Sequence, residues 1–147
     1  MRIELSVNGN AIEVDVEPTT MLVDVLRDHV ALTGPRVTCG VGLCGTCTVL
    51  LDGEPVSSCI LMAPLALGKQ ITTIEGIPRD DEVVSCFDRQ HAFQCGFCIP
   101  GMVLTAKNMV EHGTATSREQ IREGLGGNLC RCGCYTKIVD AIEEAAR

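Results

Sequence analysis

The sequence predicts an α+β protein with a strand-rich N-terminal domain and a purely helical C-terminal domain. Apolar residues alternate with polar ones in the first part of the chain, but recur every three to four residues in the second part. Ten cysteines in 147 residues accompany only three Phe, one Tyr and no Trp. Two domains of this size would have small cores, so we expect bound metal to contribute stability.

The strands and turns of the first domain surround one helix. Thr19 or Thr20 is positioned to cap that helix, whose apolar residues share one face between Met21 and His29. A short strand at residues 71–74 would complete a domain of residues 1–75. Two hairpins are also expected. The first pairs residues 3–7 with 12–16 through a turn at Asn8–Gly9, and the second pairs residues 48–51 with 55–57 through a turn at Asp52–Gly53.

Residues 76–81 have the composition of a linker, and only helical patterns follow them. Four short helices with apolar stripes should pack as a small bundle, giving a second domain of residues 82–147. His91 is expected on a helix face and His112 at a helix C-terminus. The four helices are expected around Val83 to His91, Met102 to Val110, Ile121 to Leu125 after a Ser117–Gln120 cap, and Ile138 to Ala145.

Composition and charge argue against several classes of protein. Cysteine-rich chains can be secreted disulfide proteins, but Met1 to Gly9 lacks the apolar core of a signal peptide, which favours a reducing, cytoplasmic setting. The longest apolar stretch, Ile60 to Leu67, is broken by Pro64 and is far shorter than the roughly 20 residues of a membrane span. A net charge of −7, with scattered Lys and Arg, argues against nucleic-acid binding.

Four thiols in the first domain have the spacing of a plant-type 2Fe-2S site. The group consists of Cys39, Cys44, Cys47 and Cys59. Gly40, Gly42 and Gly45 lie among the first three and allow the tight turns that point thiolates inward around a cluster. Their backbone N–H groups could also stabilise the extra negative charge of a reduced cluster.

Two other interpretations of this loop are possible. The three glycines match GxGxxG, but residues 46–51 after them have a strand pattern instead of the helix that a dinucleotide site requires. Zinc is the stronger alternative, because a CxxC pair is also typical of zinc sites. The wide gap between Cys39 and Cys44, together with the glycines, favours iron–sulfur.

A second group of four thiols lies in the helical domain. It consists of Cys95, Cys98, Cys130 and Cys132. Each pair precedes an expected helix, with Pro100 as the first residue of one, so both helix dipoles would favour an anionic cluster. CxxC with a distant CxC leaves zinc open here. No histidine has ligand spacing, so both sites should be all-cysteine and not Rieske-type.

Three stretches resemble one family of proteins over essentially the whole chain. They are CGVGLCGTCTV at 39–49, QCGFCIPGM at 94–102 and GNLCRC at 127–132. They are similar to the small iron–sulfur subunit of the molybdenum hydroxylases, the xanthine dehydrogenase, aldehyde oxidoreductase and carbon monoxide dehydrogenase family. The resemblance implies a ferredoxin-like β-grasp domain followed by a four-helix bundle domain, and a 2Fe-2S cluster on the second group.

The resemblance also implies partners and a role. A large subunit would carry molybdopterin, in its cytosine dinucleotide form, and hydroxylate the substrate with oxygen from water. Electrons would pass through the two clusters to FAD on a medium subunit, in a hetero-oligomer with duplicated protomers. The second thiol group would lie near molybdenum and the first near the flavin. Gln94 and Cys132 match positions that contact the pterin, although Gln94 could simply make a buried hydrogen bond.

The chain departs from the family at one point. The family usually has CRCTGY, whereas here Gly133 and Cys134 precede Tyr135. Cys130 and Cys132 match the motif and remain the expected ligands, while Cys134 is either an alternative ligand or a small buried thiol. Cys86, alone in the middle of a helix, is expected in the core.

Three functions are therefore compared: an electron-transfer subunit of a hydroxylase, a free-standing two-cluster ferredoxin, and a zinc-stabilised interaction module. A simple ferredoxin would need only one domain and one cluster, which favours the first. No catalytic acid, base or nucleophile is expected on this chain. The substrate is accordingly left open among purines, aldehydes, carbon monoxide, N-heterocycles and acyl-CoA thioesters.

Overall fold

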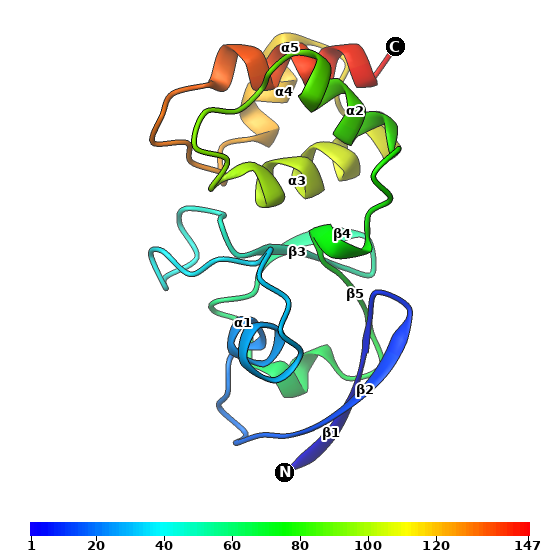
Figure 1. Ribbon diagram of the computed structural model, residues 1–147, viewed down its shortest axis with the longest axis vertical. Helices are drawn as coiled ribbons and strands as arrows, with labels where there is room; N and C mark the ends of the chain where they lie inside the picture. The colour runs from blue at the N-terminus through cyan, green and yellow to red at the C-terminus, as the bar shows by residue number, and fades with distance from the viewer.

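The N-terminal part is built on a five-stranded sheet in the computed structural model, which describes residues 1–147. The helical C-terminal part is stacked on this sheet along the long axis of the molecule (Figure 1). The chain is therefore a mixed α+β protein, as predicted. The strands are β1 (Arg2–Val7), β2 (Asn10–Asp15), β3 (Thr48–Leu51), β4 (Glu54–Ser57) and β5 (Gln70–Thr72).

The order of the strands is β2-β1-β5-β3-β4, and only the β1–β5 pair is parallel. Both predicted hairpins are confirmed. The φ values are 51° at Asn8 and 79° at Gly9 in the first turn, and 52° at Asp52 and 87° at Gly53 in the second. Two consecutive positive φ values are the requirement of a two-residue I′ hairpin turn, which Asn-Gly and Asp-Gly meet at little steric cost. The last strand ends at Thr72, because Ile74 begins a 3₁₀ turn.

One short helix packs on the sheet, but it begins differently from the prediction. Helix α1 (Leu22–Asp24) continues into a π-helical turn, Val25–His29, and buries Leu22 and Leu26 against the strands. Neither Thr19 nor Thr20 caps it, since Met21 occupies the N-cap position and no side chain caps. The first helical N–H groups bond instead to the carbonyl groups of Leu61 and Ser58, at 2.7 and 3.2 Å.

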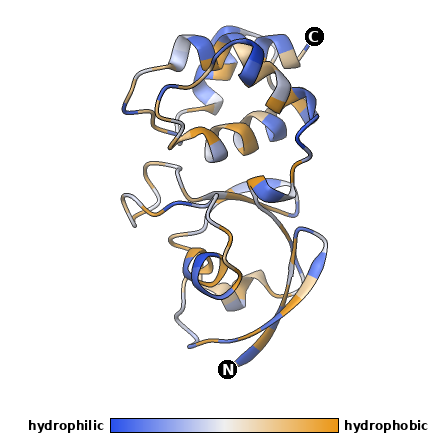
Figure 2. Cartoon of the chain, in the orientation of Figure 1, coloured by the Kyte–Doolittle hydropathy of each residue, from blue (hydrophilic) through white to orange (hydrophobic).

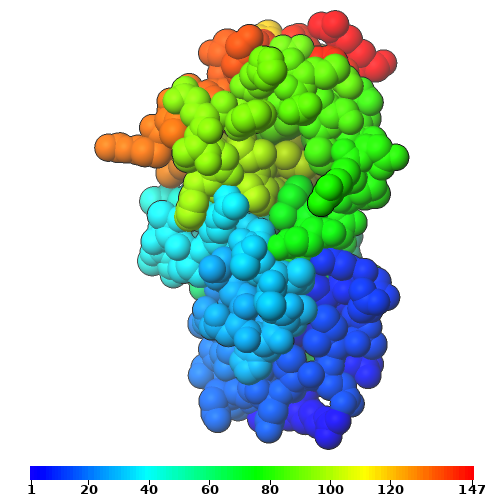
Figure 3. All heavy atoms as spheres, viewed as in Figure 1, coloured from blue at the N-terminus to red at the C-terminus, as the bar shows by residue number.

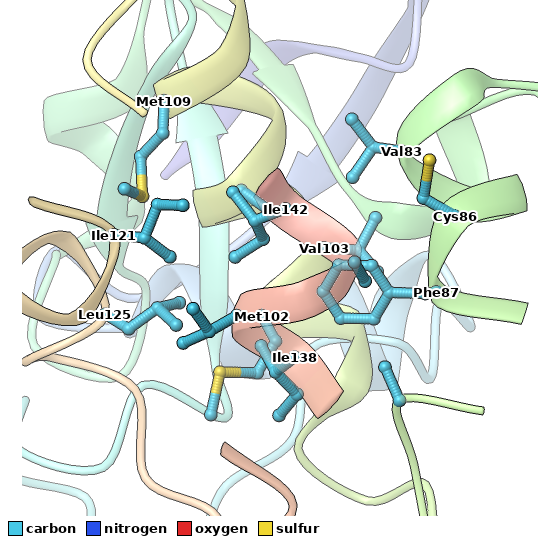
Figure 4. Packing of buried hydrophobic residues seen from close by; sticks show 14 of the residues in the cluster. Val83, Cys86, Phe87, Met102, Val103, Met109, Ile121, Leu125, Ile138 and Ile142 are labelled. Carbon is cyan, nitrogen blue, oxygen red and sulfur yellow. The ribbon is translucent and has the colours of Figure 1, made fainter. Parts of the chain in front are cut away.

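The C-terminal part contains four helices around one core (Figure 4). They are α2 (Glu82–Arg89), α3 (Ile99–Glu111), α4 (Arg118–Gly124) and α5 (Tyr135–Ala145). Phe87, Met102, Ile121, Ile138 and Ile142 are among the buried side chains that meet there. This hydrophobic contact joins all four helices into one unit.

The ends of these helices follow the sequence in most cases. His112 is the C-cap of α3, and Ser117 caps α4 by accepting a hydrogen bond from the Gln120 N–H at 3.2 Å. The predicted capping box is only half formed, because the Gln120 side chain accepts from the Thr116 hydroxyl and not from the Ser117 N–H. Two expectations were wrong. Pro100 is the second residue of α3, because the helix begins at Ile99. His91 is not on a helix face, since it follows the end of α2 with a left-handed φ of 50°.

Helix α3 lies between the other helices and the sheet (Figure 1). Residues 101–106 are buried without interruption, so this helix is covered on both sides and not only along one stripe. Apolar segments accordingly run along it (Figure 2). Asn108 of α3 donates to the Gly53 carbonyl at 2.9 Å, which ties the helix to the β3–β4 turn. None of the helices has the length and hydropathy required to cross a membrane.

We expect Ile142→Ala to lower the free energy of unfolding by about 2–5 kcal/mol, because it leaves a cavity in the core of the four helices. Urea denaturation of the reduced, anaerobic protein, followed by circular dichroism, measures the change. Leu65→Ala is the matched control: Leu65 is 58% exposed, so its truncation should stay within about 0.5 kcal/mol of the wild type. Equal destabilisation by the two variants would contradict the core assignment.

Candidate iron–sulfur sites

The first thiol group is formed by the loop before β3 and by Cys59 just after β4. Cys44, Cys47 and Cys59 are buried, whereas Cys39 is partly exposed. Cys47 and Cys59 pack in the same small buried cluster, which brings the end of β4 beside the loop. Four thiols from this region are the number that a 2Fe-2S cluster requires.

Backbone N–H groups point at the sulfur of Cys39. Those of Val41, Leu43 and Cys44 lie 3.5, 3.4 and 3.4 Å from it. They stabilise the thiolate and lower the pKa of Cys39 to about 6. The same donors would stabilise negative charge on a bound cluster.

The glycines of this loop explain how it can turn so sharply. Gly40, Gly42 and Gly45 have φ values of 67°, 74° and 72°, in the left-handed region that glycine adopts without strain. This observation agrees with the role that the sequence predicted for them. Strand β3 follows the loop, whereas a dinucleotide-binding turn would be followed by a helix. The structure therefore excludes the dinucleotide-binding alternative, as the strand pattern in the sequence predicted.

The second thiol group is assembled from two turns that are distant in the sequence. Cys98 and Cys130 are buried, Cys132 is partly exposed and Cys95 is exposed. Cys95, Cys98 and Cys130 line one pocket, so the two turns lie side by side. A cluster held by the four thiols would lie between these turns.

Two helices begin beside this second group. Cys98 is the N-cap of α3 and Cys134 the N-cap of α5, and neither helix has a side chain that caps it. The N–H group of Phe97 lies 3.5 Å from the Cys95 sulfur. Uncapped helix N-termini carry partial positive charge, so this environment favours an anionic group.

Cys134 lies directly beside one of the expected ligands. Its sulfur is buried, 3.3 Å from that of Cys130. Burial raises the pKa of Cys134 to about 11. Burial also opposes ionisation of Cys130, but the N–H and thiol groups of Cys134, the Cys98 thiol and the Gly133 N–H together outweigh it and keep the pKa of Cys130 below its usual value. Cys134 thus fits a protonated thiol packed against the group. Cys86 is buried in α2, as predicted.

Gln94 lies on the surface next to the second group. Its Nε2 is 3.5 Å from the Cys132 carbonyl oxygen, at the long limit of a hydrogen bond, and the residue is exposed. The alternative of a buried hydrogen bond does not describe this position. The pterin-contact role of Gln94 and Cys132 stays a prediction.

The two thiol groups adjoin each other across the junction of the sheet and the helices. A pocket of about 400 Å³ is lined by Cys44 from the first group and by Cys95, Cys98 and Cys130 from the second. The Leu129 N–H donates to the Cys44 carbonyl at 2.8 Å, which joins the two cysteine-bearing turns directly. In the space-filling view the cyan segment and the orange segment meet on the same side of the molecule (Figure 3).

Arg36 provides a further link that sequence reasoning missed. Its guanidinium donates to the carbonyl groups of Gly96 and Phe97, at 3.0 and 2.6 Å, and lies 5.0 Å from the centre of the Phe97 ring. Its backbone N–H in turn bonds to the Thr46 carbonyl at 2.9 Å. Arg36 thus connects the first cysteine loop to the Cys95–Cys98 turn. A single Arg before a loop gives no sequence signal of such a contact.

Comparison with known proteins agrees with this geometry. Residues 5–72 match a family model described as a 2Fe-2S iron–sulfur cluster binding domain, and residues 73–143 match one described as a 2Fe-2S binding domain. The chain is 40% identical to the nicotinate dehydrogenase small FeS subunit of Eubacterium barkeri, over 97% of this chain and 93% of that protein. It is 39% identical to the nicotine 6-hydroxylase small subunit of Paenarthrobacter nicotinovorans, over 99% and 89%.

Solved structures show the same fold. Quinoline 2-oxidoreductase from Pseudomonas putida 86 superposes with a TM-score of 0.93 at 44% identity, over 99% of this chain and 92% of that chain. Aldehyde oxidoreductase from Desulfovibrio desulfuricans gives a TM-score of 0.91 at 41% identity, over 99% of this chain but 17% of that chain. This chain therefore corresponds to one portion of a larger polypeptide in the second case.

The fold and the two thiol groups define an iron–sulfur protein with two 2Fe-2S-binding domains, which favours iron–sulfur over zinc in both halves. Within that class, the chain belongs to the small iron–sulfur subunits of the molybdenum hydroxylases, as its sequence motifs predicted. It is an electron-transfer subunit of a multi-subunit oxidoreductase.

We expect Cys134→Ser to retain both clusters, because burial keeps the Cys134 thiol protonated beside Cys130. Iron and sulfide analysis, with EPR after reduction, measures cluster content. Cys132→Ser is the matched comparison and should lose one of the two EPR signals. Loss of a signal in Cys134→Ser, with retention in Cys132→Ser, would make Cys134 the ligand.

We expect Cys39 to ionise at a lower pH than Cys59 in the folded, cluster-free chain. Its lowered pKa means that the thiolate is present above about pH 6 and is lost as the pH falls through that value. Cys59, whose pKa burial raises to about 11, should stay protonated at neutral pH. Peptide mapping after iodoacetamide labelling at a series of pH values measures both. Parallel labelling of Cys39 and Cys59 would contradict the N–H stabilisation; the urea-unfolded chain is the control.

Proposed function

We propose that this chain carries electrons singly from a molybdopterin site on a large partner subunit to FAD on a medium partner subunit. Two 2Fe-2S clusters would be the carriers. The first would be held by Cys39, Cys44, Cys47 and Cys59, and the second by Cys95, Cys98, Cys130 and Cys132. Bound there, the clusters supply one-electron redox chemistry, and the chain supplies the thiolates, the N–H donors and the spacing.

The adjacency of the two thiol groups is the observation that carries this proposal. The backbone runs from Cys130 to its neighbour Leu129, crosses one hydrogen bond of 2.8 Å to the Cys44 carbonyl, and reaches the first group. A short covalent path with a single hydrogen bond is a favourable route for an electron. Two carriers that served separate reactions would not need this contact.

Each group also has an exposed edge where a partner could approach. At the second group Cys95 and Gln94 are exposed, and we assign this edge to the pterin of the large subunit. At the first group Val41, Leu43 and Ile60 are 69%, 66% and 57% exposed, and form an apolar collar. We assign this collar to the flavin subunit, because apolar side chains that are gathered around a site and left exposed are typical of a docking surface.

We propose that the two clusters lie in separate domains, as the resemblance to the family implies. Residues 1–75 would form a ferredoxin-like β-grasp domain, residues 82–147 a four-helix bundle, and residues 76–81 the connection. The cytosine dinucleotide form of molybdopterin and an assembly of duplicated protomers belong to the same proposal. Relatives are named for nicotinate, xanthine, caffeine and aldehydes. No residue of this chain has a role in substrate chemistry, so no substrate is assigned.

The test is to purify the protein from its host without denaturation, and to measure iron, acid-labile sulfide, zinc, molybdenum and flavin. We expect two irons and two sulfides for each of two clusters, two distinct EPR signals after reduction, and molybdenum and FAD on co-purifying chains. Two clusters without molybdenum or partners would instead identify a free-standing ferredoxin. Zinc in place of iron would identify a zinc-stabilised module.

A further inference from the structure

We propose that Asn128 is a positioning residue that fixes the second cluster relative to the first. The proposal rests on the proposed function, because it concerns the electron path between the two thiol groups. Asn128 lies two residues before Cys130 and is only 5% exposed, while its neighbours Gly127 and Leu129 are exposed. The side chain is therefore inserted into the junction and does not face the solvent.

The carboxamide of Asn128 joins its own turn to two other segments, the end of the first cysteine loop and helix α3. Its Nδ2 donates to the Gly45 carbonyl at 3.2 Å and to the Thr48 Oγ1 at 3.3 Å. Its Oδ1 accepts from the Thr105 Oγ1 of α3 at 2.9 Å. Since the Gly45 carbonyl can only accept, the amide nitrogen must face it, which fixes the orientation of the group.

Glycines allow these segments to approach closely. A Cβ at Gly45 would collide with the Gly127 carbonyl, and a Cβ at Gly101 would collide with the Gly45 carbonyl. Backbone therefore packs on backbone between the first cysteine loop, the start of α3 and the turn before Cys130. Asn128 is the polar side chain that meets the hydrogen-bonding needs of this packed site.

The position of Gly45 explains why this contact concerns the clusters. Gly45 directly follows Cys44, whose own carbonyl accepts the Leu129 N–H at 2.8 Å. The two bonds therefore hold consecutive residues of one cysteine loop to consecutive residues of the other turn. Electron tunnelling and magnetic dipolar coupling both depend steeply on distance, so a change in this contact should alter both.

Other side chains of similar size would not reproduce these bonds. Asp would place a carboxylate against the Gly45 carbonyl without a donor, and Leu would leave the buried Thr105 hydroxyl without its acceptor. Asn supplies one acceptor and two donors in a planar group, which is the set that this site uses.

The test uses the assembled complex with both clusters reduced, and measures the EPR splitting from dipolar coupling between them. We expect Asn128→Ala to retain both signals and to show a reduced or broadened splitting, with slower electron transfer between the clusters. Thr105→Val should change the splitting in the same direction, because it preserves side-chain volume and removes only the hydroxyl that orients Asn128.

Asn108→Ala is the control. It deletes a hydrogen bond between α3 and the β3–β4 turn, from Asn108 to the Gly53 carbonyl at 2.9 Å, which belongs to neither cysteine loop. The control should keep the wild-type splitting even if it lowers stability. If Asn128 contributed only to stability, all three variants would keep the wild-type splitting.

Unchanged splitting in Asn128→Ala and Thr105→Val, with both clusters present, would overturn the proposal and leave the proposed function intact. If Asn128→Ala does not assemble, Thr105→Val alone decides. Wild-type protein without two 2Fe-2S signals would instead contradict the proposed function.

Discussion

The close packing of two cysteine-bearing turns is the constraint on which this structure depends. The loop around Cys44 and Gly45 meets the turn of residues 127–129 with backbone against backbone, and the Leu129–Cys44 hydrogen bond closes the contact. Because each turn also adjoins thiols of one group, the contact that joins the sheet to the helices also brings the two thiol groups together. The proposed electron path crosses the same junction.

Helix α3 supports this junction from within. It is buried on both sides, its N-terminus lies beside the second thiol group, and its Thr105 donates to Asn128 in the turn before Cys130. A helix that spans the whole contact in this way transmits the position of the sheet to the second site. The two parts keep separate hydrophobic cores, and α3 packs one part against the other.

Local structure could be predicted from the sequence wherever it depends on residues close together in the chain. Both hairpin turns, the Ser117 cap and the His112 helix end were predicted, because each rests on the backbone preference or the hydrogen bond of a near neighbour. Other local predictions were wrong. The predicted threonine cap of α1 is replaced by contacts with distant residues, and His91 lies in a turn after α2 instead of on its face. The carbonyl groups of Ser58 and Leu61 satisfy the start of α1 in place of a threonine cap.

The sequence by itself determined the class of this protein, since cysteine spacing, glycines and three motifs are local features that identify two 2Fe-2S sites in the small subunit of a molybdenum hydroxylase. Only the tertiary structure decided how the two sites relate. Arg36 reaches the Cys95–Cys98 turn, and Asn128 reaches Gly45, across a junction between residues that are distant in the chain. No local pattern encodes such contacts, because they arise only when two surfaces from different parts of the chain pack together.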